Sequence, residues 1–159
     1  MKRGTSAVTK LYRGTTVINK IYRGITKIWE NWVFMTGTLK TATGSSSGSD
    51  FVGSSVAIGE NVRVTEVYLT LTYSWDGTGT TSYGASISGY DINTASWFDL
   101  GTLAGEVLRP TTKTLSGTLS VSTANQERII SHIRVSGWGG LYCTSRSVSG
   151  SIKKWYQQG

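Results

Sequence analysis

The clearest pattern in the chain is the alternation of apolar and polar residues over positions 67–75, within a predicted strand over residues 62–75. One face carries Val67, Leu69, Leu71, Tyr73 and Trp75, while the other carries Thr70, Thr72 and Ser74. Successive strand residues point to opposite faces, so this pattern predicts a strand with one buried and one exposed face. Residues 113–123 alternate in the same way, with Leu115, Gly117, Leu119 and Val121 expected to point inward.

Shorter runs rich in β-branched and aromatic residues follow at intervals of roughly ten residues, with Gly, Ser and Asp between them. They predict strands over residues 33–43, 51–58, 82–90, 96–103, 128–136, 141–148 and 151–156. In the strand over 128–136, Ile129, Ile133 and Val135 are expected inward. Residues 44–49 are expected to form a flexible loop, 106–112 a connection and 123–126 a single helical turn. About eight strands with short turns predict an antiparallel, jelly-roll-like β-sandwich and an all-β fold.

The N-terminal region follows a different pattern, because one ten-residue unit occurs three times between residues 3 and 32. Arg3-Gly4 returns as Arg13-Gly14 and Arg23-Gly24. An even period keeps equivalent residues on one face of a strand, so the unit predicts a short strand closed by an Arg-Gly-Thr turn. These strands are apolar on both faces and need cover on both. We predict an attachment and oligomerisation arm over residues 1–32, followed by the sandwich over residues 33–159.

Charge is concentrated in the arm. Residues 1–32 hold seven basic residues and one acidic residue, a net charge of +6, whereas residues 33–159 hold nine basic and eight acidic residues. Such a segment suits an acidic protein surface, a nucleic acid or an anionic membrane. The basic residues recur one per strand and turn, and no nucleic-acid motif follows, which favours a protein partner over nucleic acid. The arm could instead pack on its own domain as a meander, or intertwine between copies.

The remaining composition narrows the setting. The 159 residues suffice for one domain plus an arm, and no apolar stretch approaches the roughly 20 residues of a membrane span. The N-terminus lacks the apolar core of a secretory signal. The single Cys143 excludes an intrachain disulfide and a cysteine-cluster zinc site. We therefore expect synthesis in a reducing cytoplasm and no membrane partner.

The sequence offers little catalytic chemistry. The one histidine, His132, shares a predicted strand face with Arg128, Ile130 and Arg134, which indicates a surface or interface role. Asp76, Asp91 and Asp99 lie at turn-like positions, and an Asp91-Asn93 calcium loop rests on a spacing common in turns. No nucleophile elbow, phosphate loop or metal motif is present in the sequence. We predict a protein that is not an enzyme, with no catalytic residue, cofactor or metal.

Two tryptophans are candidates for ligand contact. Trp97 follows a polar stretch, and Trp138 lies in the glycine-rich sequence over residues 137–140, where a large ring is hard to bury. Exposed aromatic rings can stack on the apolar face of a pyranose. The two rings could equally be core or inter-subunit aromatics, whereas the alternation of residues 62–75 places Trp75 in the core.

The arm carries a family resemblance. Residues 10–29, KLYRGTTVINKIYRGITKIW, resemble the KIYRG-type repeats at the N-termini of small tailed-bacteriophage virion proteins. In the third copy Glu30 and Asn31 replace the Lys and Leu or Ile of the repeat. The resemblance covers about 30 residues and does not extend into the sandwich. It implies an attachment segment. Arginine can pair with carboxylates or carbonyls through its planar fork, and aromatic residues are the usual interface anchors, so we expect docking through Tyr12, Arg13, Tyr22, Arg23, Trp29 and Trp32.

This resemblance leads to an expected function. The chain would be a non-enzymatic virion structural protein, either a head decoration or head fibre or a tail component. Its partners would be other virion proteins (capsid, portal or tail), and it would be made in the cytoplasm of a host bacterium. We expect a homo-oligomer, with a trimer favoured by analogy with viral fibres. The alternative is a host-surface adhesin whose sandwich binds glycan through Trp97 or Trp138.

Overall fold

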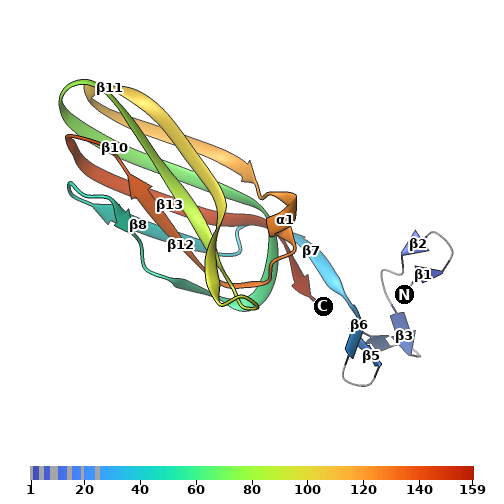
Figure 1. The fold of residues 1–159 in the computed structure, drawn as a ribbon. Helices are drawn as coiled ribbons and strands as arrows, with labels where there is room; N and C mark the ends of the chain where they lie inside the picture. The colour runs from blue at the N-terminus through green and yellow to red at the C-terminus, as the bar shows by residue number, and fades with distance from the viewer. Residues whose placement is uncertain (1, 4–5, 8–10, 14–15, 19, 24–25) are drawn as a thin grey trace.

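The computed structural model describes the backbone of residues 2–3, 6–7, 11–13, 16–18, 20–23 and 26–159, and the side chains from Asn31 onward. Within these residues the chain is almost entirely antiparallel β-structure, as predicted (Figure 1). The elements in chain order are β1 (Lys2–Arg3), β2 (Ser6–Ala7), β3 (Leu11–Arg13), β4 (Thr16–Ile18), β5 (Lys20–Arg23), β6 (Thr26–Glu30), β7 (Trp32–Thr36), β8 (Thr41–Ser46), β9 (Phe51–Val52), β10 (Val56–Asp91), β11 (Ser96–Ser120), α1 (Thr123–Gln126), β12 (Ile130–Trp138) and β13 (Cys143–Gln158).

Strands β1–β6 form three small hairpins, and each hairpin is a two-stranded sheet of its own. Their registers repeat with the sequence, since the last pairs before the turns are Arg3 with Ser6, Arg13 with Thr16 and Arg23 with Thr26. The turn residues themselves lie outside the described part. The described strands of the arm do not pair with the sandwich, and Figure 1 shows them beyond the end where β7 lies.

One long hairpin organises the sandwich. β10 and β11 pair antiparallel from Asp91 and Ser96 at the closed end to Glu66 and Ser120 at the open end. The pairing breaks between Trp75 and Gly79, where the chain passes from one sheet to the other. The bend contains Gly77 and Gly79, which have φ angles of 71° and 97°, a conformation that glycine adopts at little cost. Each long strand therefore contributes to both layers.

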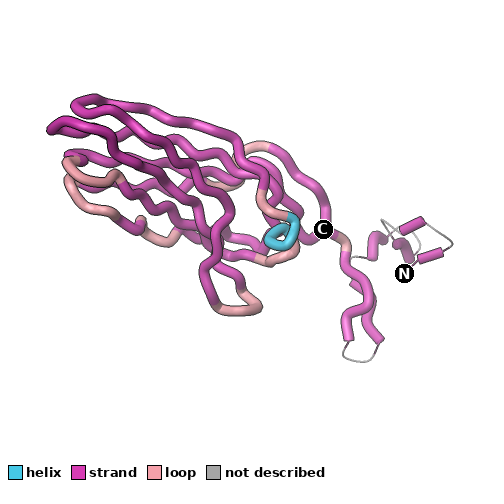
Figure 2. Tube along the Cα trace, turned by 45° about the horizontal axis from the view of Figure 1, so that its top comes forward, coloured by secondary structure: helices cyan, strands magenta, loops and turns pink. Residues whose placement is uncertain are grey.

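The two layers differ in their outward side chains, and we name them accordingly. The hydroxyl sheet consists of β8, β13, residues 62–75 and residues 111–120, with β7 paired to the end of β13. The aromatic sheet consists of β9, residues 56–57, β12, residues 79–91 and residues 96–109. A long hairpin folded across two antiparallel sheets is the jelly-roll arrangement, which confirms the predicted fold class. Figure 2 shows the strands running the length of the sandwich and the loops gathered toward its ends.

The core lies between the two sheets. The five residues predicted to face inward from 62–75 (Val67, Leu69, Leu71, Tyr73 and Trp75) are all buried. Burying a side chain of this size contributes about 1.5–3 kcal/mol. From the aromatic sheet, Ile87 and Val135 approach so closely that a Cβ at Gly150 would lie 2.8 Å from Val135 Cγ1 and 3.0 Å from Ile87 Cδ1. The sandwich thus covers its own apolar faces.

Several expected boundaries were wrong, for identifiable reasons. Residues 44–46, expected in a loop, continue β8 along β13, because a glycine at position 44 leaves room for the Phe51 ring against the backbone. Residues 106–112, expected in a connection, continue β11 as an edge strand, where Pro110 removes no necessary ladder bond. Conversely, the strand expected over 33–43 is interrupted at residues 37–40.

Two local predictions had mixed outcomes. In β12, Ile133 and Val135 are buried as expected, but Ile130 is buried in place of Ile129, because the pairing shifts by one residue between Tyr90 and Asp91. The helical turn over 123–126 is present as α1, although its N-cap Ser122 makes no capping side-chain bond. Among the described residues α1 is the one helix, and its four residues cannot cross a bilayer.

Candidate functional site

The structure places the arm residues expected to dock only by their backbones. Tyr12 and Arg13 end β3, and Tyr22 and Arg23 end β5 at the equivalent place in the next hairpin. Trp29 lies in β6, where it pairs with Ile21. The side chains of these residues lie outside what the structure describes. Their backbone positions show that the two Tyr-Arg pairs occupy matching positions beside matching turns.

Trp32 belongs to the sandwich rather than to the hairpins. It begins β7 and pairs with Gln158 of β13. The Arg63 guanidinium lies 4.3 Å from the centre of its ring, a cation–π contact. Just before it, Asn31 is buried, and its carbonyl oxygen accepts a hydrogen bond of 3.1 Å from the Gly159 N–H. The arm therefore leaves the sandwich at Glu30, two residues before the expected boundary.

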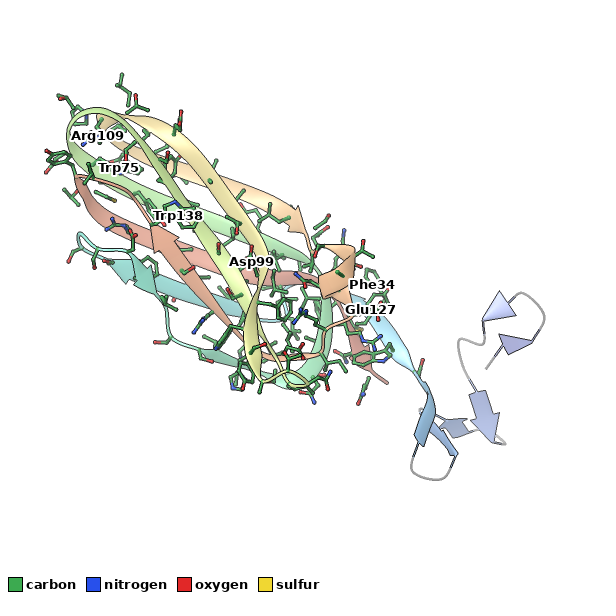
Figure 3. All side chains as sticks on the ribbon, viewed as in Figure 1. Phe34, Trp75, Asp99, Arg109, Glu127 and Trp138 are labelled. Atoms are coloured by element: carbon green, nitrogen blue, oxygen red, sulfur yellow. The ribbon has the colours of Figure 1, made fainter. Side chains whose placement is uncertain are left out.

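An exposed aromatic pair lies beside this exit. The rings of Phe34 and Tyr156 are 5.1 Å apart, and the two residues are 48% and 37% exposed. A hollow of about 220 Å³ adjoins them, lined by Trp32, Arg63, Thr65, Gln126, Glu127 and Tyr156. Figure 3 shows Phe34 and Glu127 at the end of the sandwich from which the arm leaves. We call these residues the arm root.

Trp97 lies in a second cluster, on the outer face of the aromatic sheet. It pairs with Tyr90 across the β10–β11 hairpin, and their rings meet edge to face at 5.4 Å. Tyr90 in turn pairs with His132 of β12, whose ring lies 6.3 Å away. Three adjacent strands thus bring three rings into one row across the sheet. His132 and Arg134 face outward, as the sequence predicted.

Two hollows meet at His132 and together form a groove. One of about 170 Å³ is lined by Ser55, Tyr90, Trp97 and His132. The other, of about 320 Å³, is lined by Ala57, Gly59, Glu60, Asn61, Ser131 and His132. His132 is the residue that both hollows share, and we call the two hollows together the Trp97 groove. Its lining combines aromatic rings with carboxylate, amide, imidazole and hydroxyl groups.

A cation lies over the Trp97 ring, beside the groove, although it is not one of the residues that line the two hollows. The Arg134 guanidinium is 4.1 Å from the centre of the Trp97 ring. Asp99 occupies the same cross-strand row, because both residues pair with Ser88. However, the Asp99 carboxylate accepts bonds from the Gly101 N–H at 3.2 Å and the Thr102 hydroxyl at 2.8 Å. No carboxylate of the described residues lies within ion-pair distance of Arg134.

The loop beside the groove is fixed by Asp91. One carboxylate oxygen accepts the Asn93 N–H at 2.9 Å, and the other lies 3.3 Å from Arg128. Burial alone would raise the pKa of Asp91, but these bonds, those from Thr94 and the Arg128 charge hold it below its ordinary value. The Asp91–Asn93 spacing that could suit calcium thus forms a turn closed by its own hydrogen bonds. Within the described residues no cluster of His, Cys, Asp and Glu suits a metal.

Trp138, the other candidate for glycan contact, lies apart from the Trp97 groove. It ends β12 and pairs with Gly84, where a Cβ would overlap the indole ring. Tyr90 is six residues further along the same strand, a separation of roughly 20 Å. Trp138 was expected in a loop, but a close approach to Gly84 lets its ring lie against the sheet. The two tryptophans therefore do not form one site.

The opposite face of the sandwich is uniform. Four strand segments of the hydroxyl sheet point fourteen Ser and Thr side chains outward, with Tyr68 beside them (Thr41, Thr43, Ser45, Thr70, Thr72, Ser74, Thr112, Thr114, Ser116, Thr118, Ser145, Ser147, Ser149 and Ser151). Neighbours bond across strands, as between Thr72 and Thr114 at 2.9 Å and between Ser74 and Thr112 at 2.8 Å. These bonds stabilise the sheet.

The single cysteine is enclosed at the far end of the sandwich. Burial raises the pKa of the Cys143 thiol, although the nearby Arg146 charge lowers it. The thiol lies 3.4 Å from the Ser145 carbonyl oxygen, to which it donates. A protonated, buried thiol is a poor nucleophile. Cys143 therefore contributes to packing beside Arg146, which is itself buried against Asp50 at 3.3 Å.

Sequence reasoning found Trp97 but missed its partners. Tyr90 and Arg134 were not singled out, because nothing in the local sequence says that residues 90, 97, 132 and 134 meet. The one available signal was that Arg134, His132 and Tyr90 occupy outward positions in predicted strands. The register of β10 against β11 and β12 is what brings them together.

Comparisons by sequence found no relatives: no family model matches the chain, and no curated protein matches it. Solved structures resemble it only distantly. A chain from the structure of infectious bursal disease virus, Gx strain, is 13% identical with a TM-score of 0.42, over 96% of this chain and 42% of that chain. A chain from the T13 particle of the same virus is 14% identical with a TM-score of 0.44, over 86% of this chain and 38% of that one.

A different kind of protein shows a similar likeness. The family 11 carbohydrate-binding module from Clostridium thermocellum, solved with a β-1,3-1,4-mixed-linked tetrasaccharide, is 11% identical with a TM-score of 0.34. That match covers 93% of this chain and 98% of the module. By contrast, the chain spans about two-fifths of the viral chains. Similarity at these levels leaves the function of this chain open.

Proposed function

We propose that the chain is a non-enzymatic structural protein of a bacteriophage virion. Its N-terminal arm docks to the particle, and its jelly-roll sandwich projects from it as a head decoration, head fibre or tail component. The protein is made in the cytoplasm of the bacterial host and ends in the virion. Its docking partners are other virion proteins of the capsid, portal or tail.

The observation that carries the proposal is the contrast in pairing. The described strands of β1–β6 pair only within their own hairpins, while the sandwich closes a core without them. An isolated two-stranded hairpin is marginally stable at best. A segment with apolar residues on both strand faces and a net charge of +6 is therefore suited to fold against a partner. The repeat resemblance of residues 10–29 supports the same role.

Homo-oligomerisation is part of the proposal. Three copies around a closed axis would let each arm cover the others and leave no open sheet edge. The exposed Phe34–Tyr156 pair at the arm root offers apolar surface where the arms would converge. Trp32 and Arg63 hold the start of β7 against the sandwich and so fix the direction in which the arm leaves.

Deletion of residues 1–30 tests the proposal. The phage that encodes the chain is grown without this protein, and its particles are purified. These particles are mixed either with the full chain or with the chain that lacks residues 1–30, and then sedimented. We expect the full chain to co-sediment and the deleted chain to stay in solution with an unchanged melting temperature. Trp97→Leu, which leaves the arm intact, is the matched control and should dock normally. Equal docking of the deleted chain would contradict the proposal.

A second candidate function is glycan binding at a host surface, because the Trp97 groove presents aromatic rings beside polar groups. Such a combination suits a pyranose, whose apolar face stacks on a ring while its hydroxyls bond to side chains. The deletion of residues 1–30 separates the two functions. An adhesin keeps its glycan binding without the arm, whereas a protein that only decorates the particle loses its one binding activity.

A further inference from the structure

We propose that the Trp97 groove binds a saccharide with one carboxylate, and that Arg134 receives this carboxylate at the Trp97 end. The proposal rests on the second candidate function, since it specifies which glycans the groove would take. It goes beyond that candidate by predicting charge, orientation and approximate length of the ligand.

The rings set the class of ligand. Tyr90 lines the groove between Trp97 and His132, and its ring stands at a steep angle to each of the other two. The angled rings leave a hollow of about 170 Å³ with Ser55 on its other side. This space suits a compact ring with an apolar face and peripheral hydroxyls. A long aliphatic chain would offer no hydrogen bond to the Ser55 hydroxyl, or to the one His132 ring nitrogen that does not already face the Ser131 hydroxyl at 2.8 Å.

Arg134 sets the charge. Its guanidinium lies on the Trp97 ring, and the described residues supply no carboxylate partner within ion-pair distance. Asp99, the carboxylate in the same row, is already bonded to Gly101 and Thr102. Stacking holds the planar guanidinium while its N–H groups remain able to donate. A guanidinium held in this way suits bidentate pairing with a carboxylate.

The other end of the groove sets the orientation. Glu60 and Asn61 line the hollow beyond His132 and are both exposed. A second carboxylate on the ligand would meet the like charge of Glu60, whereas neutral hydroxyls could donate to it. The groove crosses strands spaced about 4.8 Å apart, so its four strand segments span roughly 15 Å, enough for two or three pyranose rings. A short oligosaccharide with one acidic sugar at its end fits this arrangement, with the acidic sugar at Arg134 and the neutral sugars toward Glu60 and Asn61.

The molecule supplies matched controls. Arg109 also stacks on an aromatic ring, 4.7 Å from the centre of Tyr142, but it lies at the far end of the sandwich (Figure 3). Trp138 is a second half-buried indole on the aromatic sheet, away from the groove. Figure 3 shows Trp138 between Asp99 and Arg109 along the length of the sandwich. Changes at these positions alter the same residue types without touching the groove.

The test uses the full chain on a printed glycan array in which each carboxylated oligosaccharide is paired with a neutral one of the same backbone, such as sialyllactose with lactose. Glycans that bind are then measured by titration calorimetry against Arg134→Gln, Trp97→Leu, Arg109→Gln and Trp138→Leu. Thermal melting of each variant checks that it is folded. We expect Arg134→Gln to weaken binding of the acidic glycan about tenfold or more and to leave its weaker neutral counterpart within about twofold.

The possible outcomes distinguish a failure of the proposed carboxylate site from a failure of glycan binding, the second candidate function. Binding of acidic glycans that is lost in Arg134→Gln and Trp97→Leu, and kept in Arg109→Gln and Trp138→Leu, supports the proposal. If neutral and acidic glycans bind equally and both lose binding in Trp97→Leu, the proposed role of Arg134 is overturned, while the second candidate function, glycan binding, stands. Acidic binding that falls equally in Arg134→Gln and Arg109→Gln is unspecific charge attraction and overturns the proposal. No binding to any glycan overturns both the inference and the second candidate function.

Discussion

The arm and the sandwich are both built from antiparallel strands, but the two regions differ in how the faces of their strands are covered. In the sandwich every long strand has one outward face and one face buried against the other sheet. In the arm, the described strands pair two by two and do not join the larger sheet. The sequence pattern differs accordingly, with alternation of apolar and polar residues over 67–75 and apolar residues on both faces of the repeat.

The comparison explains how one chain can hold two roles. Alternation lets a sheet bury one face against a second sheet of the same chain, so the sandwich needs no partner for its stability. Strands that are apolar on both faces lack this solution within so short a segment. If the arm takes its cover from a particle or from other copies, its folding and its binding are a single event. Four predictions test this division.

The largest expected effect concerns the arm tyrosines. Tyr12 and Tyr22 hold matching backbone positions in successive hairpins, so we expect them to fill repeated pockets on the docking partner. Changing both to Ala should weaken docking by roughly 2 kcal/mol or more for each, almost independently of salt. Particle binding measured across a salt series gives this loss directly.

Arg13→Ala with Arg23→Ala is the matched double variant, because each arginine directly follows one of the tyrosines. Ion pairs at the rim of an interface should contribute under about 1 kcal/mol each and should weaken as salt rises. A greater loss for the arginine variant than for the tyrosine variant at about 0.5 M salt, where exposed pairs are screened, would refute the pocket model. The arm would then be an electrostatic tether, and nucleic acid would return as a candidate partner.

The next effect compares a core residue with an arm residue. Leu69 is fully buried between the sheets, so Leu69→Ala should lower the free energy of unfolding by about 2–5 kcal/mol. Ile18→Ala, an apolar truncation in the arm, should change the unfolding of the free chain by less than about 0.5 kcal/mol. Denaturant titration of the isolated chain measures both. A loss above 1–2 kcal/mol for Ile18→Ala would show, by this measure, that the arm packs on its own sandwich.

The smallest effect tests a charge that the sandwich satisfies internally. The folded pKa of Asp91 is held below its ordinary value, so its ionised form stabilises the fold above the pKa of the unfolded chain. This contribution is lost as the pH falls through the folded pKa. Asp91→Asn should therefore cost about 1–2 kcal/mol at pH 7, and the difference from wild type should shrink below about pH 4. A difference that stays constant with pH would contradict this account.

The sequence predicted which side chains face the core wherever the pattern within one strand determines it. Alternation alone identified the buried face of residues 67–75 and the inward Val121, because such strands carry their orientation in their own residues. It failed where a distant residue decides. Gly44 continues a strand because Phe51 packs on it, and Ile130 replaces Ile129 because β12 shifts against β10.

The candidate site shows the same limit. Trp97 stood out by its type, but Tyr90, His132 and Arg134 join it only through two strand registers, which local patterns do not determine. Trp138 stood out for the same reason as Trp97, yet it lies elsewhere on the sheet. For the arm, the repeat predicted equivalent strand positions. The two pairs nearest the turn match between β3–β4 and β5–β6, and the register of β5–β6 then shifts between Ile21 and Tyr22.

Hydrogen exchange on the arm tests the central claim most directly. Amide protection of residues 11–30 is measured in the isolated chain, shown to be monomeric by sedimentation, and again in the assembled particle. We predict rapid exchange in the monomer, strong protection after assembly, and strong protection of residues 62–75 in both states. Strong protection of the arm in a demonstrated monomer would contradict the account, because the hairpins would then be stable without any partner.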